Sequence, residues 1–254
     1  MLKNYRGKMY ANTLARRYGS GGGFDPTSYG TLALWLDAAD VTGTGTNPSD
    51  GSAVTTWVNK GGIGSSATNF GDPTLSATGV NGKPGIFLNG FSMGFRGTVA
   101  NTGAVSTTFA VATLSNAAGN YARLVSMAGN TGADFDSGSY CIPFLRDLTS
   151  PQNLSGYRGN AVLSTKSTPA YDTPFYATSV FDLTNNTVYV NGVAGSVVAN
   201  AGPFAITKYG VGIQPNQDGD YWRGYVSEVL IYNSALSTTN RQAVEAYLAT
   251  KWVI

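Results

Sequence analysis

The sequence predicts an all-β fold: a two-sheet antiparallel sandwich with one short C-terminal helix. Two observations indicate it. Short apolar runs are separated by turn-forming stretches rich in Ser, Thr, Asn and Gly, and the 254 residues include 33 glycines. Aromatic residues, which favour half-buried pleated surfaces, make up 12% of the chain. Charged residues are also only 12%, which excludes a chain that is disordered throughout.

Predicted strands follow one another along the chain. In the first, residues 32–37, leucines alternate with other residues. The pair Asn191-Gly192 favours a tight type I′ hairpin turn, and Asn185-Asn186 is predicted to form a turn as well. Residues 150–153 are predicted to be a polar loop. The further predicted strands are residues 54–58, 85–88, 91–95, 107–114, 123–127, 140–145, 160–163, 175–181, 187–190, 193–198, 206–213 and 222–232.

The last predicted strand is apolar on both faces. Strict alternation places Val226, Leu230 and Tyr232 on the same face as Glu228. It places Val229 and Ile231 on the other face. A strand that is apolar on both faces is covered on both. We therefore expect Glu228 to be a structural residue, held by hydrogen bonds or by an arginine.

A single helix is predicted after this strand. Ser237 is a good N-cap, and Val244, Tyr247 and Leu248 are spaced so that they form one apolar stripe, which Trp252 continues. This helix is one candidate cover for the last strand.

The sequence lacks the residues that most common catalytic sites need. It contains no histidine, so a Ser-His-Asp triad, a Cys-His pair and a histidine-ligated zinc site are excluded. Glutamate occurs only as Glu228 and Glu245, and no strand carries the paired carboxylates that glycoside hydrolysis needs. The pairs Asp134/Asp136 and Asp218/Asp220 lie in Gly-containing, turn-like contexts, where solvated carboxylates are expected.

Other features of the sequence concern disulfides, membrane insertion and secretion. Cys141 is the only cysteine, so we expect a buried small apolar residue and no disulfide within the chain. No segment approaches the roughly 20 apolar residues that span a bilayer. The first residues also lack the apolar core of a Sec signal peptide.

The first 23 residues differ in composition from the rest. They contain five basic residues and no acid, and they end in Gly-Ser-Gly-Gly-Gly, which is typical of a flexible linker. We divide the chain into an arm and linker (1–23) and a folded domain (24–254). The domain has 11 basic and 14 acidic residues and lacks a basic aromatic stripe, so nucleic-acid binding is not expected. The arm residues predicted to dock onto a partner are Lys3, Tyr5, Arg6, Lys8, Tyr10, Arg16, Arg17 and Tyr18.

Several stretches resemble a known family. They are residues 32–40 (LALWLDAAD) with 54–62 (VTTWVNKGG), residues 83–90 (KPGIFLNG), and residues 224–233 (GYVSEVLIYN) continuing to 247–252 (YLATKW). Together they resemble bacterial and phage laminin-G-like domains of the concanavalin A-like lectin/glucanase superfamily. The resemblance covers residues 30 to 254 and implies a jelly roll of two curved antiparallel sheets. It also implies binding or adhesive roles, usually without catalysis.

The resemblance implies calcium as a candidate ligand, because some members of the family bind it through acidic and carbonyl oxygens. The acids near motif or loop positions are Asp37, Asp40, Asp218 and Asp220. The alternative, which we favour, is that no metal binds and that Asp37 and Asp40 accept hydrogen bonds from loop backbone.

Three functions compete. The first is a non-enzymatic structural or attachment protein of a phage particle, in the capsid or the tail. There the arm would dock onto other virion proteins within an oligomeric assembly, and the jelly roll would face outward, with host-surface glycans as further partners. The second is a lectin-like module outside a virion, secreted or at the cell surface without a Sec signal. The third and least favoured is a glucanase-type enzyme using Glu228.

The candidate sugar-binding residues lie in one loop. They are Asn216, Asp218, Asp220, Tyr221 and Trp222, a mixture of aromatic faces and polar groups that suits sugars. For Trp222 a second interpretation stays open: it could begin the next strand and pack in the core.

Overall fold

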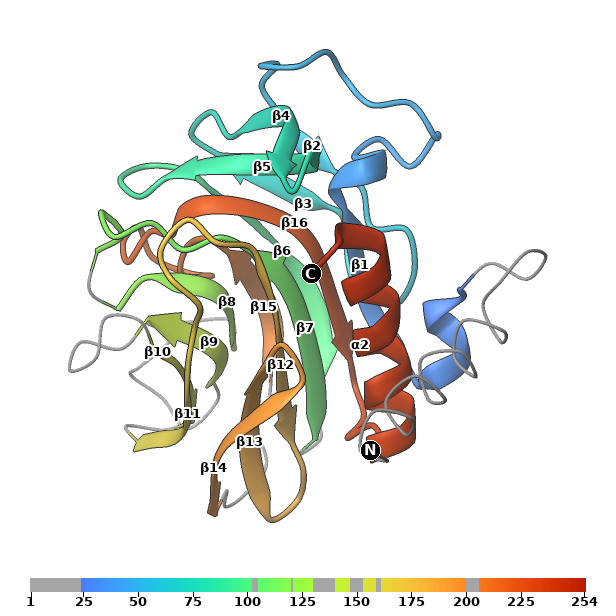
Figure 1. Cartoon of the computed structure of the whole chain (residues 1–254), viewed down its shortest axis with the longest axis vertical. Helices are drawn as coiled ribbons and strands as arrows, with labels where there is room; N and C mark the ends of the chain where they lie inside the picture. The colour runs from blue at the N-terminus through green and yellow to red at the C-terminus, as the bar shows by residue number, and fades with distance from the viewer. Residues whose placement is uncertain are drawn as a thin grey trace, which may run out of the picture.

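The computed structural model describes residues 24–101, 105–119, 121–129, 140–146, 153–158, 161–199 and 206–254. The predicted arm and the pair Asp134/Asp136 lie outside these ranges, so the boundary at residue 23 stays a prediction. The described residues form two antiparallel sheets and a C-terminal helix that lies against one of them (Figure 1). The predicted fold class, an all-β sandwich with a short terminal helix, is confirmed.

The first sheet has the strand order β14-β13-β12-β7-β16-β5-β4, and β1 pairs with β16 beside this path. Its strands are β1 (Leu32–Asp37), β4 (Thr74–Val80), β5 (Lys83–Asn89), β7 (Ser106–Ala112), β12 (Phe175–Phe181), β13 (Asn185–Val190), β14 (Val193–Ala199) and β16 (Arg223–Tyr232). Two short 3₁₀ helices flank β1, η1 (Pro26–Tyr29) before it and η2 (Ala38–Asp40) after it.

The second sheet has the order β11-β10-β9-β8-β15-β6-β3-β2. Its strands are β2 (Thr56–Trp57), β3 (Ala67–Phe70), β6 (Gly94–Asn101), β8 (Arg123–Ala128), β9 (Tyr140–Arg146), β10 (Asn153–Arg158), β11 (Ala161–Ser167) and β15 (Ile206–Val211).

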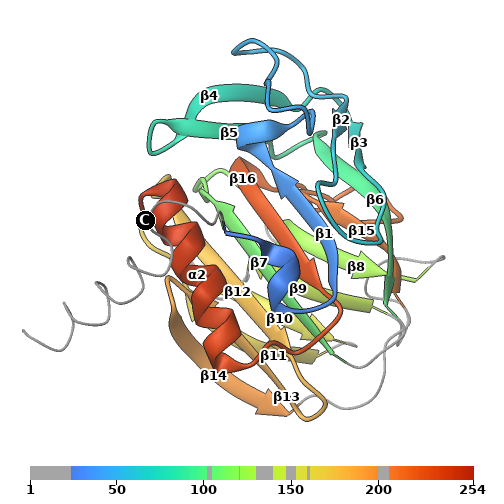
Figure 2. The same cartoon turned by 90° about the vertical axis from the view of Figure 1, so that its right-hand side faces the viewer.

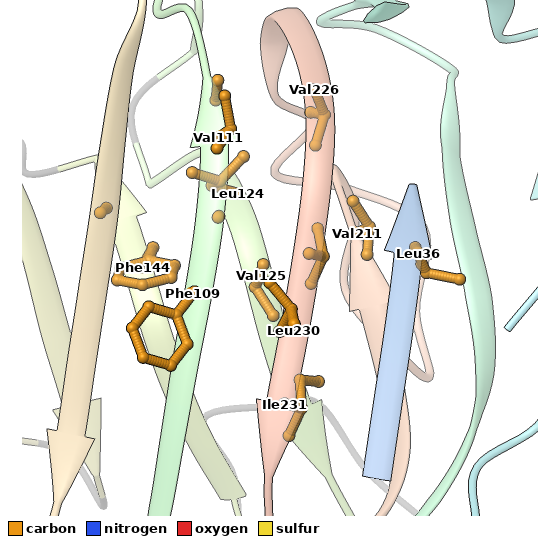
Figure 3. Close-up of a cluster of buried hydrophobic side chains, with 14 of the residues drawn as sticks. Leu36, Phe109, Val111, Leu124, Val125, Phe144, Val211, Val226, Leu230 and Ile231 are labelled. Carbon is orange, nitrogen blue, oxygen red and sulfur yellow. The ribbon is translucent and has the colours of Figure 1, made fainter. Parts of the chain in front are cut away.

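The core lies between the two sheets. Both sheets contribute to the cluster of buried side chains in Figure 3, which includes Leu36 and Ile231 from the first sheet and Val125, Phe144 and Val211 from the second. All five are fully buried. Burying a side chain of this size contributes about 1.5–3 kcal/mol, so this interface is the main source of stability.

Strand β16 is the central strand of the first sheet. It pairs with β7 on one side, and on the other with β5 at its beginning and β1 at its end. Every residue from Val226 to Tyr232 is buried. The prediction that both faces of this strand are covered is confirmed.

One predicted face assignment in β16 was wrong. Val226 pairs with Ala112 of β7, whereas Glu228 pairs with the next residue of β7, Val111, so Ser227 is an extra residue in the ladder. Adjacent residues of a strand point to opposite faces, and the bulge therefore places Val226 on the opposite face from Glu228. Periodicity alone cannot show such an insertion.

The C-terminal helix α2 (Thr238–Trp252) packs against the first sheet (Figure 2). As predicted, the Ser237 hydroxyl caps it by accepting a hydrogen bond from the Asn240 N–H (3.2 Å). The predicted stripe is buried at Val244, Leu248 and Trp252. Within the described part of the chain, no helix is long and apolar enough to cross a membrane.

Two predicted local features were wrong because aspartate and asparagine side chains place the turns elsewhere. Asn185-Asn186 belongs to β13, and the turn before it forms where Asp182 accepts from the N–H of Thr184 and of Asn185. The expected strand at residues 91–95 starts only at Gly94, because the Asn89 side chain accepts hydrogen bonds from the backbone N–H groups of Phe91 and Ser92 and so forms a turn there. Strands β3, β4 and β10 were not predicted.

Candidate functional site

Asp37 and Asp40, the first candidate calcium ligands, have cationic partners. Lys60 Nζ lies 3.0 Å from Asp37 and 3.2 Å from Asp40, and Lys251 Nζ lies 2.8 Å from Asp37. Both carboxylates also accept backbone hydrogen bonds, Asp37 from Ala39 and Asp40 from Gly45, as expected. Among the described residues, no group of three or more His, Cys, Asp or Glu side chains is arranged to hold a metal ion.

Glu228 is a structural residue held by hydrogen bonds, the first of the two expected arrangements; the donors are a lysine and three aromatic side chains. Its fully buried carboxylate accepts from Trp35 Nε1 (2.8 Å), Tyr247 Oη (2.8 Å), Lys251 Nζ (2.9 Å) and Trp252 Nε1 (2.6 Å). Burial raises the pKa of Glu228, and the charge of Lys251 opposes this. This geometry gives Glu228 no access to a substrate; that the protein is not an enzyme stays a prediction.

The base of the predicted sugar-binding loop is fixed by polar contacts. Asp220 accepts from Gln214 Nε2 (2.6 Å) and lies 3.3 Å from Arg123 Nη2, whose side chain is completely buried. Asn216 Nδ2 donates to the carbonyl of Gly129 (2.9 Å). The loop is therefore anchored to β8, and Asp220 and Asn216 serve this anchoring.

Trp222 is not a sugar-binding residue, so its place among the candidates was wrong. Its side chain is fully buried and its Nε1 donates to the Thr113 carbonyl (3.0 Å). The alternative interpretation, that Trp222 packs in the core just before β16, is confirmed.

The outer part of the loop presents Asp218 and Tyr221, and the fold places two further residues beside them. Phe70, at the end of β3, stacks on Tyr221 with ring centroids 6.0 Å apart. The guanidinium of Arg96, on β6, lies 4.9 Å from the Phe70 centroid and 3.0 Å from Asp218 Oδ1. Arg96 also donates to the carbonyls of Gln214 and Gln217, which fixes its position.

A second aromatic-arginine pair lies next to the first. Phe91, in the β5–β6 turn, is 68% exposed, and the guanidinium of Arg223 lies 5.8 Å from its ring centroid. Gly71 follows Phe70 in the β3–β4 loop, and a Cβ added to it would lie 2.0 Å from the Ser92 carbonyl oxygen. The β3–β4 loop and the β5–β6 turn therefore contact each other. We call this region the loop-end surface; it consists of Phe70, Phe91, Arg96, Asp218, Tyr221 and Arg223. Figure 1 shows the β5–β6 turn and the β15–β16 loop at one end of the sandwich.

Sequence reasoning found Asp218 and Tyr221 but missed Phe70, Phe91, Arg96 and Arg223. They lie in separate strands and turns, and each resembles an ordinary surface or strand residue. No local signal links them; only the pairing of β6 with β3 and with β15 brings Phe70 and Arg96 to this loop.

Comparison with known proteins gives a fold and no family. No family model and no curated protein matches the sequence. Domain 4 of AbnA, a GH43 extracellular arabinanase from Geobacillus stearothermophilus solved in complex with arabinotriose, has a TM-score of 0.51 and 15% identity, covering 85% of this chain and 98% of that one. A Trypanosoma rangeli sialidase in complex with 2,3-difluorosialic acid has a TM-score of 0.57 and 16% identity, covering 92% and 35%.

A third similar structure is the receptor-binding domain of botulinum neurotoxin C/D mosaic serotype, with a TM-score of 0.56 and 12% identity, covering 85% of this chain and 51% of that one. The chain thus spans only about a third of the sialidase and half of the toxin domain. At these identities the likeness shows the fold alone, a β-sandwich. The narrower laminin-G-like assignment stays a prediction.

Proposed function

We propose that the protein is a laminin-G-like carbohydrate-binding module whose ligand lies on the loop-end surface. The observation that carries the proposal is the stacked pair of half-exposed rings, Phe70 and Tyr221, beside the ion pair of Arg96 with Asp218. Sugars present C–H faces that pack on aromatic rings and hydroxyls that bond to charged groups. This surface offers both within one cluster.

The polar groups of the cluster have bonding capacity left. Within the described residues, Arg96 Nη1 and Asp218 Oδ2 take part in no hydrogen bond, and the Asp218 side chain is 63% exposed. Burial and the nearby Asp218 raise the pKa of Tyr221, so its phenol is neutral at physiological pH and both donates and accepts. These groups fit sugar hydroxyls.

The fold comparison supports this reading. The arabinanase domain, which this chain matches over 98% of the domain's length, was solved in complex with arabinotriose. A β-sandwich with a similar fold has therefore been solved with a bound oligosaccharide.

The test is a glycan microarray, followed by calorimetry on the strongest hit. We expect Tyr221→Ala and Asp218→Ala each to weaken binding by about tenfold, since each removes a stacking or hydrogen-bonding group. Leu183→Ala, at a 70% exposed position in the β12–β13 turn, is the control and should leave binding unchanged. Unchanged affinity in both site variants would reject the loop-end surface as the site.

We propose as a second role that the basic arm attaches this module to a larger assembly, most specifically a phage particle with the sandwich facing outward. The charge composition of residues 1–23 supports it, because Arg and Tyr are favoured where a segment docks onto a protein surface. Deletion of residues 1–23 should abolish incorporation into particles and leave glycan binding intact. Incorporation that survives the deletion would exclude the arm as the anchor.

A further inference from the structure

Arg223 differs from the other arginines around the loop-end surface. Arg96 and Arg123 each pair with an aspartate, Asp218 and Asp220 respectively. The guanidinium of Arg223 makes no ion pair and no hydrogen bond within the described residues; its one contact of this kind is with the ring of Phe91. A half-buried guanidinium without an acidic partner has its full donor capacity available.

The position of Arg223 is nevertheless well defined. It is the first residue of β16, paired with Asn89 of β5, so its backbone is part of the sheet. The turn after Asn89 packs against its stem: a Cβ on Gly90 would lie 2.8 Å from the Arg223 Cβ. The ring of Phe91 lies within cation–π distance of the guanidinium, with 5.8 Å between the ring centroid and the guanidinium carbon.

Arg223 also lies next to the rings proposed to bind sugar. It follows Tyr221 by two residues, with only the buried Trp222 between them, and the turn that carries Phe91 touches the loop after Phe70 through Ser92 and Gly71. A sugar chain stacked on Tyr221 would therefore bring its next unit towards Arg223 and Phe91.

We infer that the glycan bound at the loop-end surface is acidic, and that its carboxylate or sulfate binds the guanidinium of Arg223 while the same sugar unit packs on Phe91. This inference rests on the carbohydrate-binding function proposed above. A guanidinium binds such planar or tetrahedral anions through two parallel hydrogen bonds, which a neutral hydroxyl cannot match. The acids of the surrounding loops do not satisfy it, since Asp218 and Asp220 pair with Arg96 and Arg123, and Asp72 makes no ion pair with it.

The test compares acidic and neutral forms of one glycan. A microarray holding neutral, uronate-containing, sialylated and sulfated oligosaccharides identifies the hit; calorimetry then measures the hit against its methyl ester or its desulfated form. We expect the acidic form to bind at least tenfold more tightly, and Arg223→Gln to remove that difference. Raising the salt concentration should weaken the acidic form more than the neutral one, because exposed charges are screened.

Three further variants make the result specific. Arg223→Lys keeps the charge and loses the fork, so it should recover only part of the preference. Phe91→Ala changes an exposed side chain and should weaken both forms without affecting folding. Lys83→Gln, which removes a positive charge from the other end of β5, is the matched control and should retain the full preference.

The outcomes separate the two proposals. A preference for the acidic form that disappears only in Arg223→Gln supports the inference. Equal binding of the acidic and neutral forms, or an equal loss for both in Arg223→Gln, overturns the acidic-ligand inference and leaves the sugar-binding function standing. Absence of binding to any glycan, with folding verified by thermal unfolding, rejects the proposed function and the inference with it.

Discussion

The indole Nε1 of Trp252 donates a 2.6 Å hydrogen bond to the buried carboxylate of Glu228. One residue belongs to the last turn of α2 and the other to the central strand of the first sheet, so this bond joins the helix to the sandwich. Trp35, Tyr247 and Lys251 donate to the same carboxylate. A single acid thereby connects β1, β16 and α2.

Replacing this acid should destabilise the fold strongly. Glu228→Gln removes the negative charge that faces Lys251. It also replaces one acceptor oxygen with an NH₂ group, which would face the side chains that now donate to the carboxylate. We expect a loss of about 3 kcal/mol of unfolding free energy, as is typical when one partner of a buried ionic cluster is removed. Urea denaturation measures it, with the exposed Gln242→Ala on α2 as a control that should change stability by less than about 0.5 kcal/mol. A loss no larger than that of the control would contradict the assigned role.

Gly62 is predicted to resist substitution because of where its Cβ would point. Its φ is +94°, and an added Cβ would lie 2.4 Å from the carbonyl oxygen of Leu32 and 2.4 Å from the carbonyl carbon of Ala33. We expect Gly62→Ala to cost about 3 kcal/mol, from backbone strain together with overpacking.

Gly51 provides the matched comparison. Its φ is +77°, but an added Cβ would meet no atom within 4 Å. Gly51→Ala should therefore cost only the strain, about 1 kcal/mol. Denaturant unfolding of the two variants in parallel measures the difference. Equal losses of unfolding free energy would show that the close contact with the backbone of β1 does not contribute to the cost of Gly62→Ala.

Alkaline pH should destabilise the protein through its buried tyrosines. Burial and the nearby Glu245 raise the pKa of Tyr176 from 10.0 to about 12, with Arg241 opposing. A group whose pKa is raised on folding contributes stability that is complete below its unfolded pKa and is lost as the pH rises through its folded pKa. Unfolding free energy should therefore fall between pH 10 and pH 12, and less steeply in Tyr176→Phe. Burial also raises the pKa values of Tyr209, Tyr232 and Tyr247, so the variant should reduce the slope without removing it.

Cys141 should be unreactive in the folded protein. The sequence predicted a buried apolar role, and the side chain is fully buried on β9. Burial raises the pKa of the thiol well above its usual value, although Arg158 opposes this, and the thiolate is the reactive form. A coloured thiol reagent should label no cysteine in native buffer and one per chain in guanidinium chloride. Rapid labelling of the native protein would show that β9 opens readily.

The sequence predicted the elements whose signal is local. Asn191-Gly192 forms a turn in which both residues have positive φ, 49° and 75°, as a type I′ hairpin requires. Ser237 caps the helix because its hydroxyl reaches a backbone N–H three residues on. In both cases the residues that decide the structure are neighbours in the chain.

Prediction failed where a distant strand decides the outcome. The bulge at Ser227 lies where the partner of β16 changes from β5, which pairs up to Val226, to β1, which pairs from Glu228 onward. The bulge reversed the expected face of Val226. Strands β3 and β10 carry few apolar residues, and they are strands because neighbouring strands satisfy their backbone groups.

The sequence by itself determined the fold class, the terminal helix, the lack of histidine chemistry and the loop that carries Asp218 and Tyr221. The tertiary structure decided which side chains of that loop face solvent and which, such as Trp222, are buried. It also placed Phe70, Phe91, Arg96 and Arg223 beside the loop. The physical reason is that a sandwich is held by pairing between strands far apart in the chain. A surface built where several loops meet therefore has no continuous signature in the sequence.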